Sequence, residues 1–269
     1  MSEQIKSSHI AWKKPPFIKS DLLRWCIWLG IGIYLAFAFG TLDINWKRVA
    51  EGIPRGANFI SGFFPPDFIT NLDEILKGLN ESLWMTITST VVGIILSIPI
   101  GLGAAKNLAP LPIYLFCRGI LAVSRSFQEV IIAIFMVKFF GFGPFAGFVT
   151  LVIATIGFYG KLLAEDIEDI DPNQAEAIKS TGSSWLQWIN FSIQPQVMPR
   201  MIGLGLYRLD INFRESAVLG IVGAGGIGVV LNNAFDQYDY ETAAAVLLII
   251  ILIVMFVEYT SGFVRNMVK

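Results

Sequence analysis

Beyond Arg200 near its start, the apolar stretch of residues 197–222 is interrupted by four charged residues, which are the strongest candidates for chemistry: Arg208, Asp210, Arg214 and Glu215. If this stretch crosses a membrane, each ionised group near the bilayer centre costs about 2.5–3.5 kcal/mol and needs a partner or water. Asp210 and Arg214 are four residues apart, which predicts a packing ion pair on one helix face. Alternatively, one arginine faces an aqueous path and attracts an anion through its paired N–H donors. Both interpretations hold together, because Asp210 cannot neutralise both arginines.

A second pair of opposite charges, Arg125 and Glu129, has the same spacing of four residues. Arg125 is expected at the membrane interface and Glu129 deeper, so that Glu129 pairs with Arg125 in a structural role. The acidic run from Glu165 to Asp171 could suggest a metal site. Its place at the start of a polar loop instead favours a solvated surface or a contact with the basic groove of a partner.

Other chemistries lack the residues that they need. The single histidine, His9, cannot form a metal or acid–base cluster by itself, and the spacing of Cys26 and Cys117 suggests neither a metal site nor a disulfide framework. Residues 223–228 match the Gly-x-Gly-x-x-Gly dinucleotide pattern, but that pattern is meaningful only between a strand and a helix. Clustered glycines in an apolar stretch predict instead a discontinuous or tightly packed helix end.

Membrane-spanning helices must position these residues. Of the 269 residues, 54% are hydrophobic and 15% are charged, against roughly 25% charged in a soluble domain. Runs of about 20 apolar residues match a hydrocarbon core of about 30 Å, whereas buried helices of soluble enzymes give runs of about 10–14. We therefore expect an all-α polytopic membrane protein in contact with lipid. The predicted spans are residues 22–42, 82–105, 124–141, 143–164, 197–222 and 242–263.

The distribution of Lys and Arg predicts the orientation of these spans, because positive residues near the membrane remain on the cytoplasmic side. With six spans, both termini and the loop 165–195 are cytoplasmic, while residues 43–81 and 229–241 lie outside. The net charge of −1 gives no basic field and argues against a nucleic-acid partner.

Three smaller expectations concern the organisation of the chain. Residues 1–21 are predicted to be a cytoplasmic tail and residues 22–269 the transmembrane domain. Residues 63–68 carry two prolines among phenylalanines, which is typical of an interfacial turn and would equally suit a receptor-docking surface. Residues 107–123 are predicted to form an interfacial helix that leads into the third span.

A polar, helix-prone segment lies between two of the apolar runs and needs something outside the membrane to contact. Its spacing resembles the EAA loop of ATP-binding-cassette (ABC) importer permeases, which reads Glu-Ala-Ala, then Gly after three residues, and ends on Pro. The matching positions are Glu176, Ala177, Gly182 and Pro195, while Ile178 and Gln194 depart from the pattern. No Gly-x-x-x-x-Gly-Lys-Ser/Thr loop is present in the sequence, so if ATP drives this protein, another subunit binds it.

Several further stretches, taken together, resemble the membrane subunit of a phosphonate ABC importer over roughly residues 60–265. They are FFPPDF at 63–68, LSIPIGL at 96–102, GFGPFAG at 141–147, PQVMP at 195–199, LYR at 206–208 and VGAGGIGV at 222–229. The resemblance implies the type I importer permease fold, with about six spans and a cytoplasmic coupling loop at about 165–195. It also implies a homodimer, two cytoplasmic ABC ATPase subunits and an extracytoplasmic phosphonate-binding protein.

The resemblance further implies a function for the charged and polar residues. The chain would be a bacterial inner-membrane permease that imports phosphonate, with phosphite or a related phosphorus oxyanion as the alternative. It would hold no cofactor and no ATPase site, since the partner subunit binds ATP and Mg. The matching loop residues would couple to that ATPase, and Arg214, then Arg208, would line the substrate path with Asp210 and Glu215. From the residues alone, an ATP-independent secondary transporter and a membrane-bound phosphotransferase stay open.

Overall fold

A computed structural model describes residue 18 and residues 20–42 and 45–268, and every regular element in these ranges is helical. The chain divides into two compact units, residues 1–59 and 60–269. The predicted cytoplasmic tail, residues 1–21, lies almost wholly outside the described residues, so the division after residue 21 stays a prediction.

The first unit contains α1 (Asp21–Thr41) and most of α2 (Trp46–Ser61). The side chain of Ser20 caps α1 by accepting a hydrogen bond from the backbone N–H of Leu23 at 3.4 Å. At 21 residues, α1 is long and apolar enough to cross a membrane, as predicted for residues 22–42. In α2, charged side chains share the helix with apolar ones, and the helix occupies part of the loop that was predicted to lie outside the membrane.

A turn joins α2 to the second unit over the predicted stretch 63–68. The backbone N–H of Asp67 donates to the carbonyl of Glu241 at 3.1 Å, which ties the turn to the start of α11 (Tyr240–Val268). The hydrogen bond from the side chain of Thr70, with those from the backbone N–H groups of Ile69 and Thr70, lowers the pKa of Asp67. The predicted turn is therefore present, held both by local hydrogen bonds and by the contact with Glu241, and its place at the membrane interface stays a prediction.

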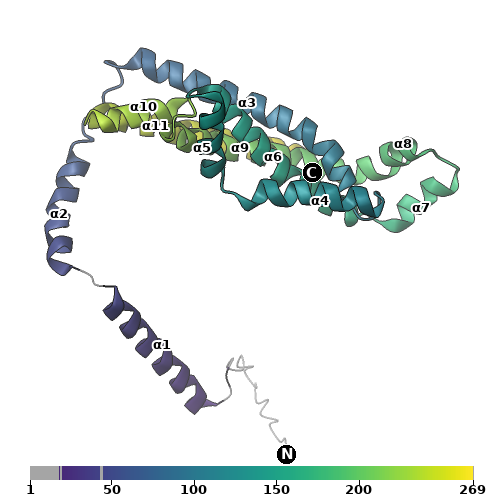
Figure 1. Cartoon of the computed structure of the whole chain (residues 1–269), viewed down its shortest axis with the longest axis horizontal. Coiled ribbons are helices and arrows are strands. Elements are labelled where there is room, and N and C mark those ends of the chain that lie inside the picture. Colours follow the sequence, from purple (N-terminus) through teal and green to yellow (C-terminus); the bar gives the residue numbers. More distant parts are fainter. Residues whose placement is uncertain (1–17, 19, 43–44, 269) are drawn as a thin grey trace, which may run out of the picture. The chain divides into compact units, whose positions relative to one another are not determined.

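Two long helices form the centre of the second unit, α3 (Leu72–Gly103) and α6 (Pro144–Glu168). Figure 1 shows them running side by side along the bundle. Small residues allow this approach: a Cβ atom on Gly93 would lie 2.6 Å from Thr155, and one on Gly101 would lie 2.8 Å from Leu163. Close packing over small residues is the usual way in which membrane helices associate.

The predicted third span, residues 124–141, is wrong as a single helix. The structure has α4 (Leu111–Ser126) and α5 (Glu129–Phe140), bent by 93° at the break between them. Helix α5 has only 12 residues, so it reaches across about 18 Å and cannot span the core alone. The predicted helix at 107–123 is α4, which starts after Pro110 and carries Pro112 in its first turn, where proline is well tolerated.

After α6 the chain forms α7 (Pro172–Ser180), α8 (Trp185–Trp188) and a π-helical turn (Ile189–Ile193). The last helices are α9 (Gln194–Ile221), α10 (Ile227–Asp236) and α11. In Figure 1, α7 and α8 project from one end of the second unit and α10 lies toward its other end.

Four described helices, α1, α3, α6 and α11, meet the length and composition of a membrane span, and the bent pair α4–α5 makes a possible fifth. They account for the predicted spans other than residues 197–222. Helix α9 covers that region with 28 residues, about 42 Å at 1.5 Å per residue. The length of α9 suffices for a membrane span. It differs from α1, α3, α6 and α11 in the number of charged residues that it carries.

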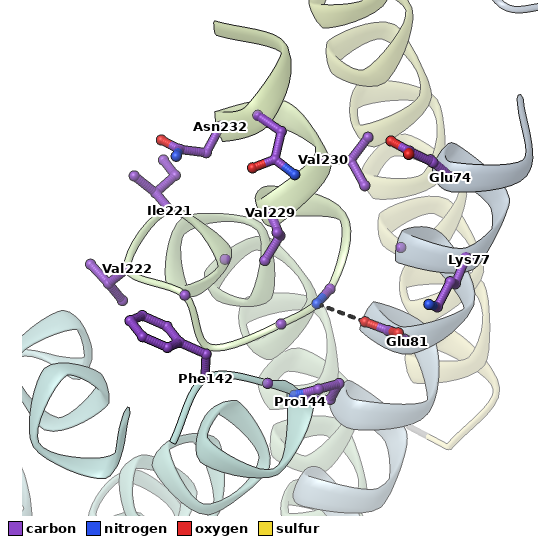
Figure 2. Close-up of a pocket in the computed structure, with 17 residues that line it drawn as sticks. Glu74, Lys77, Glu81, Phe142, Pro144, Ile221, Val222, Val229, Val230 and Asn232 are labelled. Atoms are coloured by element: carbon purple, nitrogen blue, oxygen red, sulfur yellow. Dashed lines mark hydrogen bonds between the residues drawn. The ribbon is translucent and has the colours of Figure 1, made fainter. Parts of the chain in front are cut away.

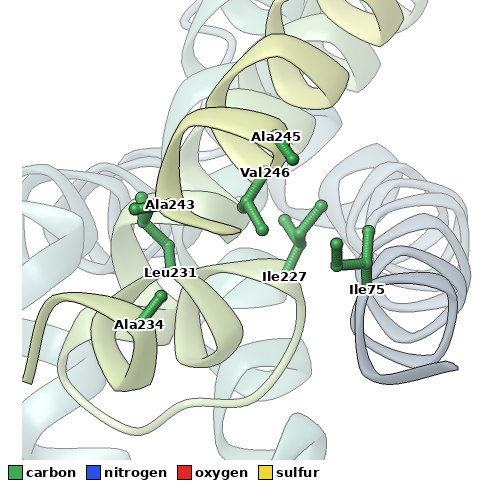
Figure 3. Packing of buried hydrophobic residues seen from close by; sticks show 7 residues of the cluster. All are labelled: Ile75, Ile227, Leu231, Ala234, Ala243, Ala245 and Val246. Atoms are coloured by element: carbon green, nitrogen blue, oxygen red, sulfur yellow. The ribbon is translucent and has the colours of Figure 1, made fainter. Parts of the chain in front are cut away.

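A hydrophobic cluster fixes the end of the unit that carries α10. It joins α3, α10 and α11 through Ile75, Ile227, Leu231, Ala234, Ala243, Ala245 and Val246 (Figure 3). Ile75 and Ile227 are fully buried. Three of the seven residues are alanines, whose small side chains allow α10 and α11 to approach closely beside the glycine-rich loop.

Candidate functional site

The polar loop predicted to contact a partner forms a helical hairpin. Helices α7 and α8 form between Asp171 and Trp188, which confirms that the segment predicted to be helix-prone is helical. Asp171 caps α7 by accepting a hydrogen bond from the N–H of Asn173 at 2.9 Å. Gly182 has φ +77°, the left-handed conformation that glycine adopts readily at the end of a helix. Glu176 and Ala177 are exposed on α7.

Several contacts make this hairpin one body with the start of α9. The indole Nε1 of Trp188 donates to the carbonyl of Ala175 at 2.9 Å, and the ammonium of Lys179 lies 5.3 Å from the Trp188 ring. The N–H of Asp171 donates to the Gln196 side chain at 2.9 Å, beside Pro195 in the first turn of α9. These contacts connect the hairpin to the first turn of α9.

The outer face of the hairpin carries large apolar side chains that the unit leaves uncovered. Trp185 is 54% exposed and Leu186 is 65% exposed. Glu176 of the same hairpin is exposed as well, so the hairpin presents both apolar and acidic side chains to its surroundings. Apolar side chains of this size on an exposed tip are typical of a protein contact.

The charged residues of α9 point to two different sides of the helix. At about 100° per residue, Arg208 and Glu215 share one face, while Asp210 and Arg214 lie on nearly the opposite one. Arg214 donates to the carboxylate of Asp210, which confirms the predicted ion pair. The side chain of Asp210 is 6% exposed and that of Arg214 is 51% exposed, so the arginine head reaches the surface of the unit.

Arg208 lies inside the bundle, with its side chain 3% exposed. Its Nε donates to Thr155 Oγ1 at 3.2 Å, its Nη2 donates to Glu215 Oε2 at 3.4 Å, and its guanidinium carbon lies 5.3 Å from the Phe158 ring centre. Beside it, the Asn212 amide donates to Thr155 at 3.0 Å. Residues of α6 and α9 thus form a buried polar layer, which sequence reasoning missed because Thr155 gives no signal in an apolar run.

Glu129 pairs with Arg208, at 3.9 Å between Oε1 and Nη2, and the predicted pair with Arg125 is wrong. The reason is the break between α4 and α5. Arg125 ends one helix and Glu129 begins the next, so a spacing of four residues no longer places them on one face. Arg125 makes no salt bridge with any residue that the structure describes.

A pocket of about 370 Å³ opens at this break, and we call it the break pocket. Residues of α4, α5, α6 and α9 line it, among them Arg125, Gln128, Glu129, Phe158 and Arg208. Two guanidinium groups, an amide and a carboxylate therefore share one cavity. Such a lining can donate hydrogen bonds to an anion and accept one from a protonated oxygen of the same ligand.

A larger pocket of about 670 Å³ lies where α9 ends. Helix α9 stops at Ile221, and Gly223, Gly225 and Gly226 have φ of +84°, +82° and +79° before α10 begins. The predicted discontinuous, tightly packed helix end is confirmed. Figure 2 shows the glycine loop facing Glu81 of α3, whose carboxylate accepts a hydrogen bond from the N–H of Gly226 at 3.3 Å.

Most of the acidic run before the hairpin is exposed, as predicted for a solvated surface, and two of its residues also bridge helices. Asp166 pairs with Arg200 at 2.8 Å, and Glu168 pairs with Arg118 at 2.9 Å. These bridges tie α6 to α9 and to α4. Among the residues described, no group of three or more His, Cys, Asp or Glu side chains is arranged to hold a metal ion.

Comparison with known proteins gives a consistent result. The model of a family described as "Binding-protein-dependent transport system inner membrane component" matches residues 97–264, more than half of the chain. The putative phosphite transport system permease protein HtxC of Stutzerimonas stutzeri is 36% identical over 235 residues, covering 87% of this chain and 83% of that protein.

Two further relatives have names from the same kind of system. The phosphate-import permease protein PhnE of Mycolicibacterium smegmatis is 35% identical over 230 residues, and the match spans 85% of this chain but 43% of that longer protein. The putative cryptic phosphonate transport system permease protein PhnE2 of Escherichia coli is 40% identical over 116 residues, 43% of this chain and 95% of that protein.

A solved structure shares the fold. An inward-facing form of the MetNI methionine ABC transporter superposes with a TM-score of 0.66 at 21% identity, covering 75% of this chain and 98% of that one. At this level of identity the likeness concerns architecture: the helices of the second unit have the arrangement of an ABC importer's membrane subunit.

Proposed function

Because this chain belongs to the family of binding-protein-dependent transport system inner membrane components, we propose that it is the membrane-spanning permease subunit of an ATP-driven importer of phosphonates. The observation that carries this proposal is the α7–α8 hairpin, a polar and partly apolar projection between two long helices. The names of the relatives support phosphorus oxyanions as the substrate class, with phosphite as the alternative to phosphonate.

The proposed assembly contains a second copy of this chain, two cytoplasmic ABC ATPase subunits and an extracytoplasmic phosphonate-binding protein. ATP and Mg would be bound by the ATPase subunits, because the sequence contains no phosphate-binding loop of the Walker type. Glu176, Ala177, Gly182 and Pro195 would couple the permease to its ATPase. Closure of the ATPase dimer would move the hairpin and, through the contacts of Trp188 and Gln196, the start of α9.

The proposed orientation in the inner membrane places both termini and the hairpin in the cytoplasm. The glycine loop and its pocket would then open to the outside, where a binding protein delivers substrate. Two observations support this arrangement: the Lys and Arg distribution, and the location of the hairpin and α10 at opposite ends of the second unit (Figure 1).

Arg214 remains our candidate for the surface of the translocation path, with Asp210 as its partner and with Arg208 and Glu215 deeper in the bundle. A half-exposed arginine in mid-helix is unfavourable against lipid, so its surface must face protein or water. In a dimer, the exposed side of α9 would meet that requirement by lining the space between two copies.

Reconstitution tests the proposed function directly. Proteoliposomes containing this chain should take up radiolabelled methylphosphonate only when the ATPase subunit, ATP and the binding protein are all present. Omission of any one of them should reduce uptake to background. Uptake that persists without the ATPase would instead identify an ATP-independent secondary transporter and overturn the proposal.

A further inference from the structure

The break between α4 and α5 has no local cause in the sequence. Phe127 (φ −110°, ψ 140°) and Gln128 (φ −69°, ψ 146°) adopt extended conformations, although neither is proline or glycine. Tertiary contacts must therefore impose it. In the described structure, the first N–H of α5 with an acceptor is that of Ile131, on the carbonyl of Gln128 at 2.9 Å. The preceding N–H groups leave a positive helix end at the break pocket.

Arg208 has hydrogen-bonding capacity that its own partners do not use. A guanidinium offers five N–H donors, and charge-assisted hydrogen bonds to carboxylates are usually about 2.7–2.9 Å long. The bonds of Arg208 measure 3.2 Å to Thr155 and 3.4 Å to Glu215, and Glu129 lies farther, at 3.9 Å. Within the described residues, Nη1 makes no hydrogen bond. A buried arginine that is held this loosely is suited to an additional, anionic partner.

Arg125 supplies a second cation to the same cavity. Its aliphatic stem passes close to Gly157 of α6, where an added Cβ would lie 2.9 Å from Arg125 Cγ. Gly157 thus brings the end of α4, and with it an arginine that has no salt bridge in the described chain, to the break pocket. The Phe158 ring, on which Arg208 stacks, adds an apolar wall that would suit a carbon substituent.

The depth of the break pocket places it along a transport route. The break pocket lies at the start of α5. The other end of this helix, 12 residues or about 18 Å away, is followed by Phe142, which lines the larger pocket. Along α9, Arg208 is 13 residues, about 20 Å, from Ile221 in that same larger pocket. Both helices therefore put the cavity at an intermediate depth of the second unit, between the levels of the glycine loop and the hairpin.

We propose that the break pocket is a specificity site for a singly protonated phosphorus oxyanion. Arg125 and Arg208 would hold two of its oxygens, and the Glu129 carboxylate would accept a hydrogen bond from the remaining P–OH group. This inference rests on the proposed function and adds a mechanism of selection. Glu129 would repel a second anion unless a proton lies between them.

Protonation separates the substrate class from sulfate. The second dissociation of a phosphate ester has a pKa of about 6, so some of its population keeps a proton near neutral pH, whereas sulfate has none to donate. Sulfate in the break pocket would leave Glu129 facing an unprotonated oxygen. The charged groups around Glu129 in the described chain are Arg125, Arg208 and Glu215. Because both arginines would already hold oxygens of the anion, neither would be left to offset that repulsion.

Direct binding tests the site without the binding protein. The full-length chain in lipid nanodiscs should bind radiolabelled methylphosphonate, and Arg125→Gln should weaken binding by about ten-fold or more, as expected for loss of one charged hydrogen-bond partner. Lys138→Gln is the matched control, because it removes one exposed cation from the far end of α5. Equal binding by wild type and Arg125→Gln, or no binding by wild type, would overturn the inference.

The role of Glu129 has its own measurement. Sulfate should compete poorly with methylphosphonate for the wild-type chain and at least ten-fold better for Glu129→Gln, since an amide can donate to an unprotonated oxygen. An unchanged sulfate-to-methylphosphonate ratio in Glu129→Gln would rule out proton-based selection. Arg208→Gln risks misfolding because it leaves Glu215 unpaired, so Arg208→Lys accompanies it and should bind more weakly than wild type while still assembling.

These outcomes are distinguishable from failure of the proposed function. If ATP-dependent uptake by the complete assembly is intact while Arg125→Gln binds methylphosphonate in nanodiscs as well as wild type does, the proposed importer function holds and the break pocket is not its specificity site. If uptake proceeds without the ATPase while Arg125→Gln still weakens binding, the specificity site stands and the ATP-driven mechanism fails.

Discussion

At the scale of single residues, two arginines six positions apart on one helix behave differently. Arg208 lies within the bundle between Glu215 and Glu129, and Arg214 reaches the surface of the unit while bonded to Asp210. Arg208 contacts residues of α5, α6 and α9, so its loss leaves the carboxylates of Glu129 and Glu215 without their cation. Arg214 can be removed together with its partner without leaving a buried charge.

A paired substitution separates the two interpretations of Arg214. Arg214→Gln should reduce methylphosphonate uptake by at least ten-fold in the reconstituted assembly. Adding Asp210→Asn removes the carboxylate that Arg214→Gln leaves unpaired. Uptake should nevertheless stay low, because the translocation path then lacks the guanidinium that offsets desolvation of the anion. Near-normal uptake by the double variant, with ATPase activity still coupled, would show that Arg214 only neutralises Asp210.

At the scale of elements, the close contact between α9 and α10 depends on the absence of a side chain. A Cβ atom on Gly228 would lie 1.9 Å from the carbonyl oxygen of Ala217 and 2.9 Å from the Cα of Gly220. These are backbone atoms, so the neighbours cannot turn away. The glycine loop and the Figure 2 pocket depend on this approach.

Gly228→Ala should therefore destabilise the fold by roughly 1–3 kcal/mol through overpacking, and the thermal midpoint of the detergent-solubilised chain should fall by several degrees. Gly262→Ala in α11 is the control, since a Cβ there meets nothing within 4 Å. That control should leave the midpoint unchanged or raise it slightly, because alanine favours a helix over glycine. An equal midpoint for both variants would contradict the close α9–α10 packing.

The hairpin is the second element with a sharp prediction. Gly182→Val places a β-branched residue at φ +77°, which strains the turn between α7 and α8, and Glu176→Lys reverses a charge on the exposed face. Each change should abolish ATP-dependent uptake and reduce copurification of the ATPase subunit. Glu51→Lys, a charge reversal in an exposed pair of α2, should do neither. Wild-type uptake in both hairpin variants would exclude the coupling role.

At the scale of the whole molecule, the proposed topology gives opposite exposure to the two ends of the second unit. In a background with Cys26→Ser and Cys117→Ala, a cysteine at Ser183 in the hairpin loop should resist an impermeant thiol reagent in intact cells. A cysteine at Gln237, after α10, should react. Labelling of the Ser183 position from outside would reverse the arrangement, and permeabilised cells provide the control that both positions are accessible.

Much of this architecture could be predicted from the sequence, because its signals are local. Runs of apolar residues long enough for a bilayer gave the spans that α1, α3, α6 and α11 confirm. A polar interval with Gly182 predicted the hairpin, and clustered glycines at 223–228 predicted the interrupted helix after α9. In each case residues adjacent in sequence fix the backbone, so no knowledge of the neighbours was needed.

Only the tertiary structure decided the contacts that join separate helices. The partner of Glu129 is Arg208 and not Arg125, because the helix is interrupted between α4 and α5. No proline or glycine at the interruption would have allowed its prediction from the sequence. The same break creates the pocket that gathers Arg125, Glu129 and Arg208. Sequence spacing specifies which residues share a face of one continuous helix. Which face meets which neighbour depends on packing, here on the close approaches that Gly93 and Gly157 permit.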